Sequence, residues 1–227
     1  MSASSRNNVG ANAGADAIGA TTAMRVAADL RQRILTGEFA PGSRLKIDDI
    51  AAICSVSHMP VRGALGALER EGILDVLPHR GAVIRAVDAT FVRNVYDLRA
   101  AIEGMLTERC AQAIDDAGIG ELRAQLSAFE RAIASADPLE VVRANRGFHD
   151  AINRHAANPD AVRVLAQGRL LVEALRVRFG FGPKRTDAIV AEHRQITRAI
   201  ARHDVDKAGR LARAHCVRAR DDLLARL

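Results

Sequence analysis

The sequence predicts a mainly α-helical chain in which a small N-terminal unit with a β-hairpin precedes a larger all-helical unit. Up to about residue 88, three short segments with helical apolar spacing are followed by two β-type runs around a tight turn. From Phe91 onward, apolar residues recur at helical spacing, with five breaks rich in Gly, Pro, Asn or Asp. We therefore expect one unit over residues 23–88 and a bundle of about six helices over residues 89–227.

Residues 1–22, "MSASSRNNVGANAGADAIGATT", are rich in Ala, Gly, Ser and Asn and have no sustained apolar period. This composition predicts a disordered tail. The alternative is a basic arm that contacts nucleic acid, for which Arg6 is the only cation in the segment.

Two helices are expected next. In the first, Val26, Leu30 and Ile34 recur every four residues, and Gly37 ends the pattern. The turn "APGSRL" then leads into a short extended stretch. The second helix has one apolar face, formed by Ile47, Ile50, Ala51 and Cys54.

A third helix begins in "VSHMPVRGALGALEREG". Ser57 is a good N-cap, and Pro60 falls in the first turn, where its missing N–H costs little. The expected buried face consists of Val61, Ala64, Leu65 and Leu68. "ILDVL" and "AVIRAV", joined by the turn "PHRG", follow as two strands. Three helices and such a hairpin make a winged helix-turn-helix, whose second motif helix enters the major groove of DNA.

This interpretation gives the exposed residues of the unit specific roles. The planar guanidinium of Arg62 suits bidentate contact with guanine or a phosphate, and Ser57 at the helix start suits a phosphate. Gly81 permits a close backbone approach in the wing. The expected DNA-binding residues are Arg31, Arg33, Arg44, Ser57, His58, Met59, Arg62, His79, Arg80 and Gly81. The alternative is that Arg62 is a solvated surface residue on an ordinary packed helix.

Charge alone does not decide between these interpretations. The net charge is +6, but residues 25–88 carry nine Lys and Arg against eight Asp and Glu. DNA binding by this unit must therefore depend on individually placed arginines.

The stretch "ILTGEFAPGSRL…IAAICSVSHMPVRGALGALEREGIL…HRGAVI" resembles the N-terminal domain of the GntR family of bacterial transcription regulators. The PG turn, the VS-x-x-PVR core and the wing glycine keep the family's spacing over about 60 residues. Ser57, Arg62 and Gly81 match the family pattern, which implies DNA binding.

Three departures from the family pattern bear on the operator sequence. His58-Met59 replaces the usual Arg-Thr before the proline, and Gly63 replaces a Glu. Asp48 stands where many members carry a DNA-contacting arginine. The resemblance implies a short palindromic operator, whose sequence these departures leave open.

Three histidines of the helical unit lie on apolar stripes of three different segments. His149 shares its stripe with Asn145, whereas His193 and His215 each recur with apolar residues at steps of three and four. Buried imidazoles on three helices suggest convergence on a divalent ion, with Zn²⁺, Ni²⁺ and Mn²⁺ as candidates. The alternative is that each is a core histidine bonded to a carbonyl group.

The segments "YDLRAAIE…NRGFHDAI…AEHRQI…RAHC" resemble the FCD effector-binding domain of the FadR-like GntR regulators, over most of residues 91–225. This resemblance implies a metal held by Asn145, His149, His193 and His215, and a small carboxylic acid as effector. Arg99 matches an arginine frequent in the first FCD helix and is the candidate anchor for the acid. Its alternative is a surface pair with Glu103, and Arg176 and Arg178 are weaker anchor candidates.

Together these features predict a cytoplasmic, homodimeric, ligand-responsive transcription regulator, more specifically a repressor, and not an enzyme. No apolar run is long enough to span a membrane, and three separated cysteines suggest reduced thiols. The alternatives are a helical metal-dependent hydrolase, a metal-free regulator that senses acyl-CoA, and an architectural DNA-binding protein. The last gives no reason for buried histidines, and the first lacks a clearly placed general base.

Overall fold

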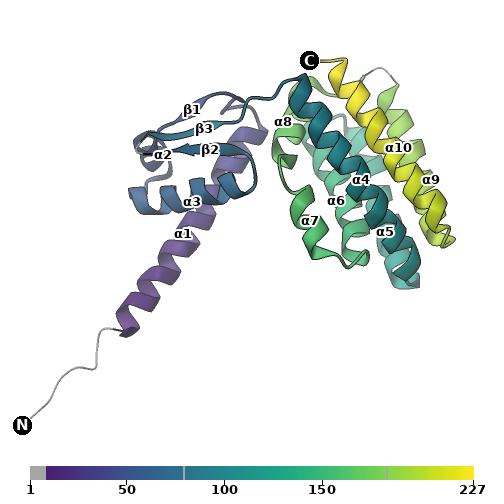
Figure 1. Ribbon diagram of the computed structural model, residues 1–227, viewed down its shortest axis with the longest axis horizontal. Coiled ribbons are helices and arrows are strands. Elements are labelled where there is room, and N and C mark those ends of the chain that lie inside the picture. The colour runs from purple at the N-terminus through teal and green to yellow at the C-terminus, as the bar shows by residue number, and fades with distance from the viewer. Residues whose placement is uncertain (1–8, 79, 183) are drawn as a thin grey trace, which may run out of the picture. The chain divides into compact units, whose positions relative to one another are not determined.

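The computed structural model describes residues 9–78, 80–182 and 184–227, with side chains from residue 21 onward. Two compact units follow one another along the chain, Met1–Ala86 and Val87–Leu227. Figure 1 labels the helices and strands of each unit. Among the described helices, none combines the length and the hydrophobicity of a membrane-spanning segment.

The first unit is a winged helix-turn-helix, as predicted. Its elements are α1 (Val9–Leu35), β1 (Arg44–Leu45), α2 (Ile47–Cys54), α3 (His58–Arg70), β2 (Leu74–Leu77) and β3 (Gly81–Ile84). The helices bury the apolar stripes that the sequence indicated, and α3 packs against α1 and α2. The three strands form an antiparallel sheet in the order β1-β3-β2, so the extended stretch after the PG turn becomes an edge strand beside the hairpin.

The helix α1 takes in residues 9–22, where we expected a disordered tail. The alanines at positions 11, 13, 15, 17 and 20 explain the difference, because alanine has the highest helix propensity. An apolar period is needed for packing but not for helix formation. Residues 1–8, with Arg6, lie outside the described residues.

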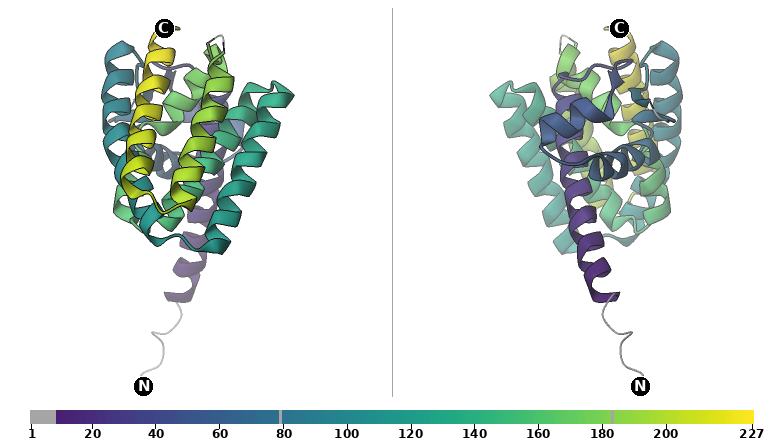
Figure 2. Two further views of the ribbon diagram at one scale, coloured as in Figure 1. Left: turned by 90° about the vertical axis from the view of Figure 1, so that its right-hand side faces the viewer. Right: turned by 90° about the vertical axis from the view of Figure 1, so that its left-hand side faces the viewer.

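The second unit is all-helical. It consists of α4 (Ala89–Ala113), α5 (Asp116–Ser135), α6 (Pro138–His155), α7 (Pro159–Leu165), α8 (Arg169–Phe179), α9 (Arg185–Ala201) and α10 (Val205–Leu224). Figure 2 shows α4, α10, α9 and α5 as neighbouring rods, and α10 contacts both α4 and α9. The helix α6 contacts α5, α4 and α8, so it lies between them in the bundle.

Four of the five predicted helix breaks owe their position to a capping side chain. Asp115, Asp137, Asn158 and Asp204 each accept a hydrogen bond from a backbone N–H of the helix that follows. The bundle has one helix more than predicted, because Gly168 separates α7 from α8 with a φ of 69°. A single glycine within an apolar pattern gave no clear sign of this break.

Candidate metal site and DNA-binding surface

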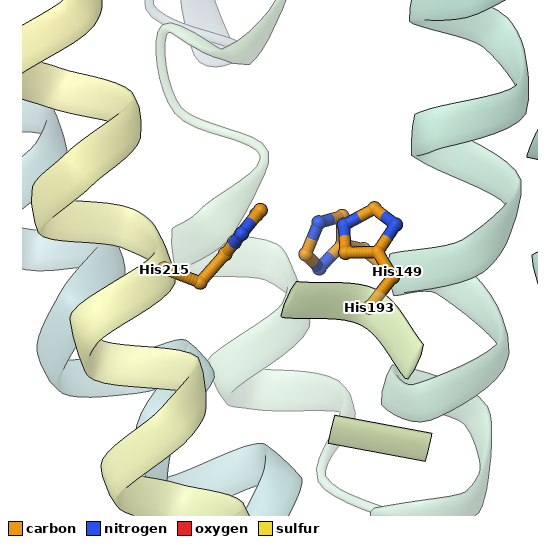
Figure 3. Close-up of side chains that lie close together, drawn as sticks. All are labelled: His149, His193 and His215. Atoms are coloured by element: carbon orange, nitrogen blue, oxygen red, sulfur yellow. The ribbon is translucent and has the colours of Figure 1, made fainter. Parts of the chain in front are cut away.

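Three histidines from three helices point toward one another in the second unit (Figure 3). His149 projects from α6, His193 from α9 and His215 from α10. One ring nitrogen of each lies within 4.8 Å of the others. The ring centroids are 4.9–5.3 Å apart, so the rings gather around one point, as the spacing predicted.

His193 lies deepest in this cluster. It is 0% exposed, and its ring lies between Phe129 and Phe148, stacked on the latter at 4.1 Å between centroids. Neither of its ring nitrogens has a hydrogen-bond partner among the residues that the structure describes. Leaving a buried polar group unpaired costs on the order of 1–3 kcal/mol, so this imidazole lacks the compensation that buried polar groups usually have.

Burial keeps two of these rings neutral. It lowers the pKa of His149 to about 4, against an opposing effect of Glu103. Burial likewise lowers the pKa of His193 well below its usual value, and the neighbouring histidines add to the shift. Neutral imidazoles offer the lone pairs that a metal ion needs.

His215 is oriented by a carboxylate on the next helix. Its Nδ1 lies 2.6 Å from Oε2 of Glu192, which fixes Nδ1 as the donor and leaves Nε2 with a free lone pair. Arg185 holds Glu192 through bonds of 2.7 and 3.1 Å, and Arg218 adds a third of 2.6 Å. Burial opposes ionisation of Glu192, but His215 and Arg185 outweigh it and lower the pKa of Glu192 to about 2.

A second carboxylate, Glu103 of α4, lies beside His149. Its Oε2 is 3.4 Å from Nδ1 of His149 and 3.3 Å from Sγ of Cys216. Arg99 donates from Nε to Oε1 of Glu103 at 2.8 Å. Burial disfavours the charge on Glu103, but Arg99 and the histidines hold its pKa at about 2. The predicted Arg99–Glu103 pair therefore exists, within the unit rather than on its surface.

A cavity of about 60 Å³ opens beside the histidines. His149, His215 and Asn145 line it, and so does Arg99. The other charged residues of its wall are Glu103, Arg146, Arg169, Glu173 and Arg176. The wall itself thus contains four arginines and two glutamates.

Each lining arginine is paired with a carboxylate. Arg146 donates from Nε to Glu173 at 2.8 Å, and Arg169 donates to both Glu173 and Asp150. Arg176 donates to Asp222 of α10. Arg178, the other anchor candidate, is exposed beside the ring of Phe179 and does not line the cavity.

The residues present fit a divalent metal ion. Two nitrogens bound to one zinc at tetrahedral angles lie about 3.4 Å apart, because each Zn–N bond is about 2.0–2.1 Å. The nitrogens lie within 4.8 Å of one another, so binding requires the rings to move inward by about 1 Å or more. A bound ion would also give His193 the partner that it lacks. Asn145 lies four residues before His149 on the same face of α6, which suits a fourth ligand.

In the first unit, α3 presents the expected reading face. Ser57 stands at its N-terminus without a side-chain capping bond, and Arg62 is exposed. Met59 is 75% exposed. Nε2 of His58 lies 3.0 Å from Oδ1 of Asp48 in α2, so two of the three departures from the family pattern contact each other.

The remaining predicted DNA-binding residues lie in α1 and the sheet. Arg31 pairs with Glu71, and Arg33 pairs with Asp29 and Glu38. Arg44 donates to the carbonyl oxygen of Arg80 at 3.1 Å, which ties β1 to the wing turn. His79 lies outside the described residues.

Gly81 is needed for the wing itself. Its φ is +86°, and a Cβ there would lie 2.0 Å from the carbonyl oxygen of Leu45. We expected DNA to approach the backbone at Gly81, but the structure shows that strand β1 lies against it. Contact between Gly81 and DNA stays a prediction.

Sequence reasoning missed several residues around the cavity. Asn153 follows His149 by four residues, so its place on the same face of α6 was foreseeable. Tyr96, Arg146, Arg169 and Glu192 carry no comparable local signal. Their positions follow from how the helices pack, which one segment's spacing does not reveal.

Two family models match the chain. The model for bacterial regulatory proteins of the gntR family covers residues 22–84, and the FCD domain model covers residues 94–218. The chain is 32% identical over 195 residues to an uncharacterized HTH-type transcriptional regulator in an unstable DNA locus of Streptomyces ambofaciens, covering 86% of this chain and 81% of that one. It is 33% identical over 135 residues to the gluconate operon transcriptional repressor of Bacillus licheniformis, covering 60% and 55%.

Solved structures share the fold. Escherichia coli McbR/YncC superposes with a TM-score of 0.78 at 19% identity, covering 90% of this chain and 97% of that one.

Proposed function

Because the chain belongs to the GntR family of bacterial regulatory proteins and carries an FCD domain, it is a transcription regulator and not an enzyme, and we propose that it is a metal-dependent sensor of a small carboxylic acid. In this proposal it is a cytoplasmic homodimer that represses transcription from a short palindromic operator. The names of two relatives, gluconate operon repressors, support a repressor that responds to an acid.

One observation carries the metal part of the proposal. A buried histidine with two unpaired ring nitrogens lies next to two further imidazoles, with one nitrogen of each within 4.8 Å. A plain apolar core would gain stability by replacing His193 with an apolar residue. Asn145, His149, His193 and His215 would hold the ion, which we expect to be Zn²⁺, with Ni²⁺ or Mn²⁺ as alternatives.

The cavity supports a small anion as effector. A bound divalent ion with an open position supplies a Lewis-acidic site for a carboxylate oxygen. Four arginines line the cavity, each paired with a carboxylate of the protein, and Arg99 remains the candidate anchor. The cavity volume of about 60 Å³ has room for a handful of water-sized groups. An acyl-CoA is far larger, which disfavours the metal-free alternative.

DNA binding is assigned to the exposed side chains of the first unit. Arg62 and Met59 at the start of α3 would contact base edges, with Ser57 on a phosphate. The arginines of α1 and the wing, Arg31, Arg33, Arg44 and Arg80, would contact the backbone. His79 and Gly81 are assigned to the wing contact on the family pattern alone.

Effector and operator are linked if the acid binds two arrangements of the dimer differently. The carboxylates that hold the metal-site histidines come from α4 and α9, so filling the cavity acts on several helices at once. A shift of these helices would change how the two reading heads of a dimer are held.

The test is a fluorescence anisotropy titration of a labelled fragment of the protein's own promoter, with the metal-loaded protein, with and without pooled carboxylic acids. We expect nanomolar binding that one acid in the pool weakens. Elemental analysis of the same sample should find about one divalent ion per chain. DNA binding that no acid alters, in a sample without metal, would overturn the sensor.

A further inference from the structure

One imidazole of the candidate metal site has a carboxylate and an arginine aligned behind it. Nδ1 of His215 donates to Oε2 of Glu192 at 2.6 Å, and Arg185 donates to both oxygens of that carboxylate, at 2.7 and 3.1 Å. Glu192 and Arg185 are 7% and 8% exposed, so little water competes for these bonds. We call the set of Arg185, Glu192 and His215 the α9 relay, because its arginine and its carboxylate belong to α9.

The same three residue types recur at a second imidazole. Nε and Nη2 of Arg99 both lie 2.8 Å from Oε1 of Glu103, and Oε2 of that carboxylate lies 3.4 Å from Nδ1 of His149. Glu103 is 6% exposed. Arg99 and Glu103 are one turn apart on α4, whereas His149 belongs to α6. This set of three residues, the α4 relay, repeats the chemistry of the α9 relay on different helices.

The place of a carboxylate decides which ring nitrogen is free to bind an ion. An ionised carboxylate only accepts hydrogen bonds, so a neutral ring beside it carries its proton on Nδ1 and keeps a lone pair on Nε2. Metal-bound histidines in proteins almost always donate their second N–H to such an acceptor. Glu103 is therefore placed to set the tautomer of His149, as Glu192 sets that of His215.

The last contact of the α4 relay is longer than that of the α9 relay. Oε2 of Glu103 is 3.4 Å from Nδ1 of His149, and the same oxygen accepts the thiol hydrogen of Cys216 at 3.3 Å. An ion on Nε2 draws electron density from the ring, which makes Nδ1–H a stronger donor, and the carboxylate in turn makes the ring a better ligand. We therefore expect the contact between Glu103 and His149 to shorten when His149 binds an ion.

We propose that Arg99 and Glu103 are positioning residues of the metal site, which hold His149 for ligation through Nε2 and strengthen its bond to the ion. The proposal rests on the proposed function, because it takes the three histidines to bind a divalent ion. It gives Arg99 a role besides that of acid anchor. Its Nε and Nη2 are committed to Glu103, which leaves Nη1 for an anion.

The first experiment determines the tautomer of His149 in the metal-free, full-length protein by nitrogen NMR of isotope-labelled histidines. The wild type should carry the proton of His149 on Nδ1. Glu103→Gln should give a mixture of tautomers, because a carboxamide offers both an acceptor and donors. The ring of His215 is the internal control and should keep its proton on Nδ1 in both proteins, since Glu192 is unchanged. A purely structural role of Glu103 would not change the tautomer.

The second experiment measures metal affinity by competition with a chelating dye. Glu103→Gln should bind Zn²⁺ about tenfold or more weakly than the wild type, as is usual when the partner of a ligating histidine is lost. Arg99→Gln should also weaken binding. The double variant should be no weaker than Glu103→Gln alone, because Arg99 acts through Glu103. Glu108→Gln is the matched control, since Glu108 lies on the same helix but pairs with Arg213 outside the cavity wall.

The outcomes separate the inference from the proposed function. If wild-type His149 carries its proton on Nε2, or if Glu103→Gln keeps the wild-type metal affinity, Glu103 does not position His149 and the metal site itself still stands. If the wild type binds no ion, the metal-dependent sensor is wrong, and the inference is wrong with it.

Discussion

The two units of this regulator place their functional side chains in opposite environments. In Met1–Ala86, the α3 side chains assigned to DNA lie on the surface, where Arg62 and Met59 are exposed and His58 lies beside the exposed Asp48. In Val87–Leu227, the candidate metal ligands lie inside the bundle, and buried carboxylates hold two of them. Changes to these α3 side chains should thus alter binding alone, and changes at the interior site should alter binding and stability together.

The largest expected effect tests the interior site. Removing the metal with a chelator should destabilise the helical unit by about 4 kcal/mol when the ion is present at a thousand times its Kd. Tyr96 is the only tyrosine, and the chain has no tryptophan, so intrinsic fluorescence follows the unfolding of this unit alone.

Variants assign this effect to the cluster. His193→Ala should lose the bound ion in elemental analysis and unfold at the same temperature with and without chelator. His155→Ala is the matched control, because its ring bonds Glu121 instead. Full metal occupancy in His193→Ala would show that His193 does not bind the ion, and the predicted interior metal site would be wrong.

The second-largest expected effect is a dependence of the unfolding free energy on pH, which should also be confined to the helical unit. The pKa of His149 is about 4 when folded, against about 6.5 when unfolded, so the unfolded chain takes up the proton first as the pH falls. The stability from the neutral ring is complete above pH 6.5 and is lost as the pH falls through 4.

For the metal-free protein, this shift predicts a loss of roughly 2.5 kcal/mol in unfolding free energy between pH 7 and 4.5. Urea denaturation followed by Tyr96 fluorescence measures it. His149→Phe should remove this part of the loss and leave the part that comes from His193, whose pKa burial also lowers. An unchanged profile in that variant would assign the effect to other groups.

In the DNA-binding unit, Arg62→Ala should weaken specific operator binding by about 1–3 kcal/mol and leave the unfolding free energy within about 0.5 kcal/mol. Arg33→Ala should instead weaken binding to all sequences alike and reduce its salt dependence. Anisotropy with operator and scrambled DNA separates these outcomes. A ratio of specific to non-specific affinity that Arg62→Ala leaves unchanged would deny it a base contact.

The smallest effect concerns the pair formed by His58 and Asp48, two residues that depart from the family pattern. Asp48→Asn should change the unfolding free energy by less than about 0.5 kcal/mol, because exposed ion pairs contribute little. It should strengthen DNA binding at low salt, because one negative charge leaves the reading face. A large loss of stability would show that even this surface is coupled to the core.

Sequence reasoning succeeded where function follows local spacing. The turn, the wing and the apolar face of α3 are set by neighbours within a few residues, and the structure confirms the winged helix-turn-helix. The stripe positions of His149, His193 and His215 likewise follow from helical periodicity alone.

It failed where position depends on packing between helices. Glu192 is adjacent to His193 in sequence, yet its carboxylate bonds His215, which lies 23 residues away on α10. Arg146 and Arg169 meet at Glu173 only because α6 packs on α8. The break at Gly168 and the helical residues 9–22 show a further limit, since helix formation itself does not require an apolar period.

Glu192 and His193 are consecutive residues on one rigid helix, and the carboxylate of the former grips the ring of His215. A movement of α9 that displaces the imidazole of His193 therefore also acts on the imidazole of His215, through the hydrogen bond to Glu192. The hydrogen bond from His215 to Glu192 thus couples the position of one imidazole on α10 to that of the other on α9.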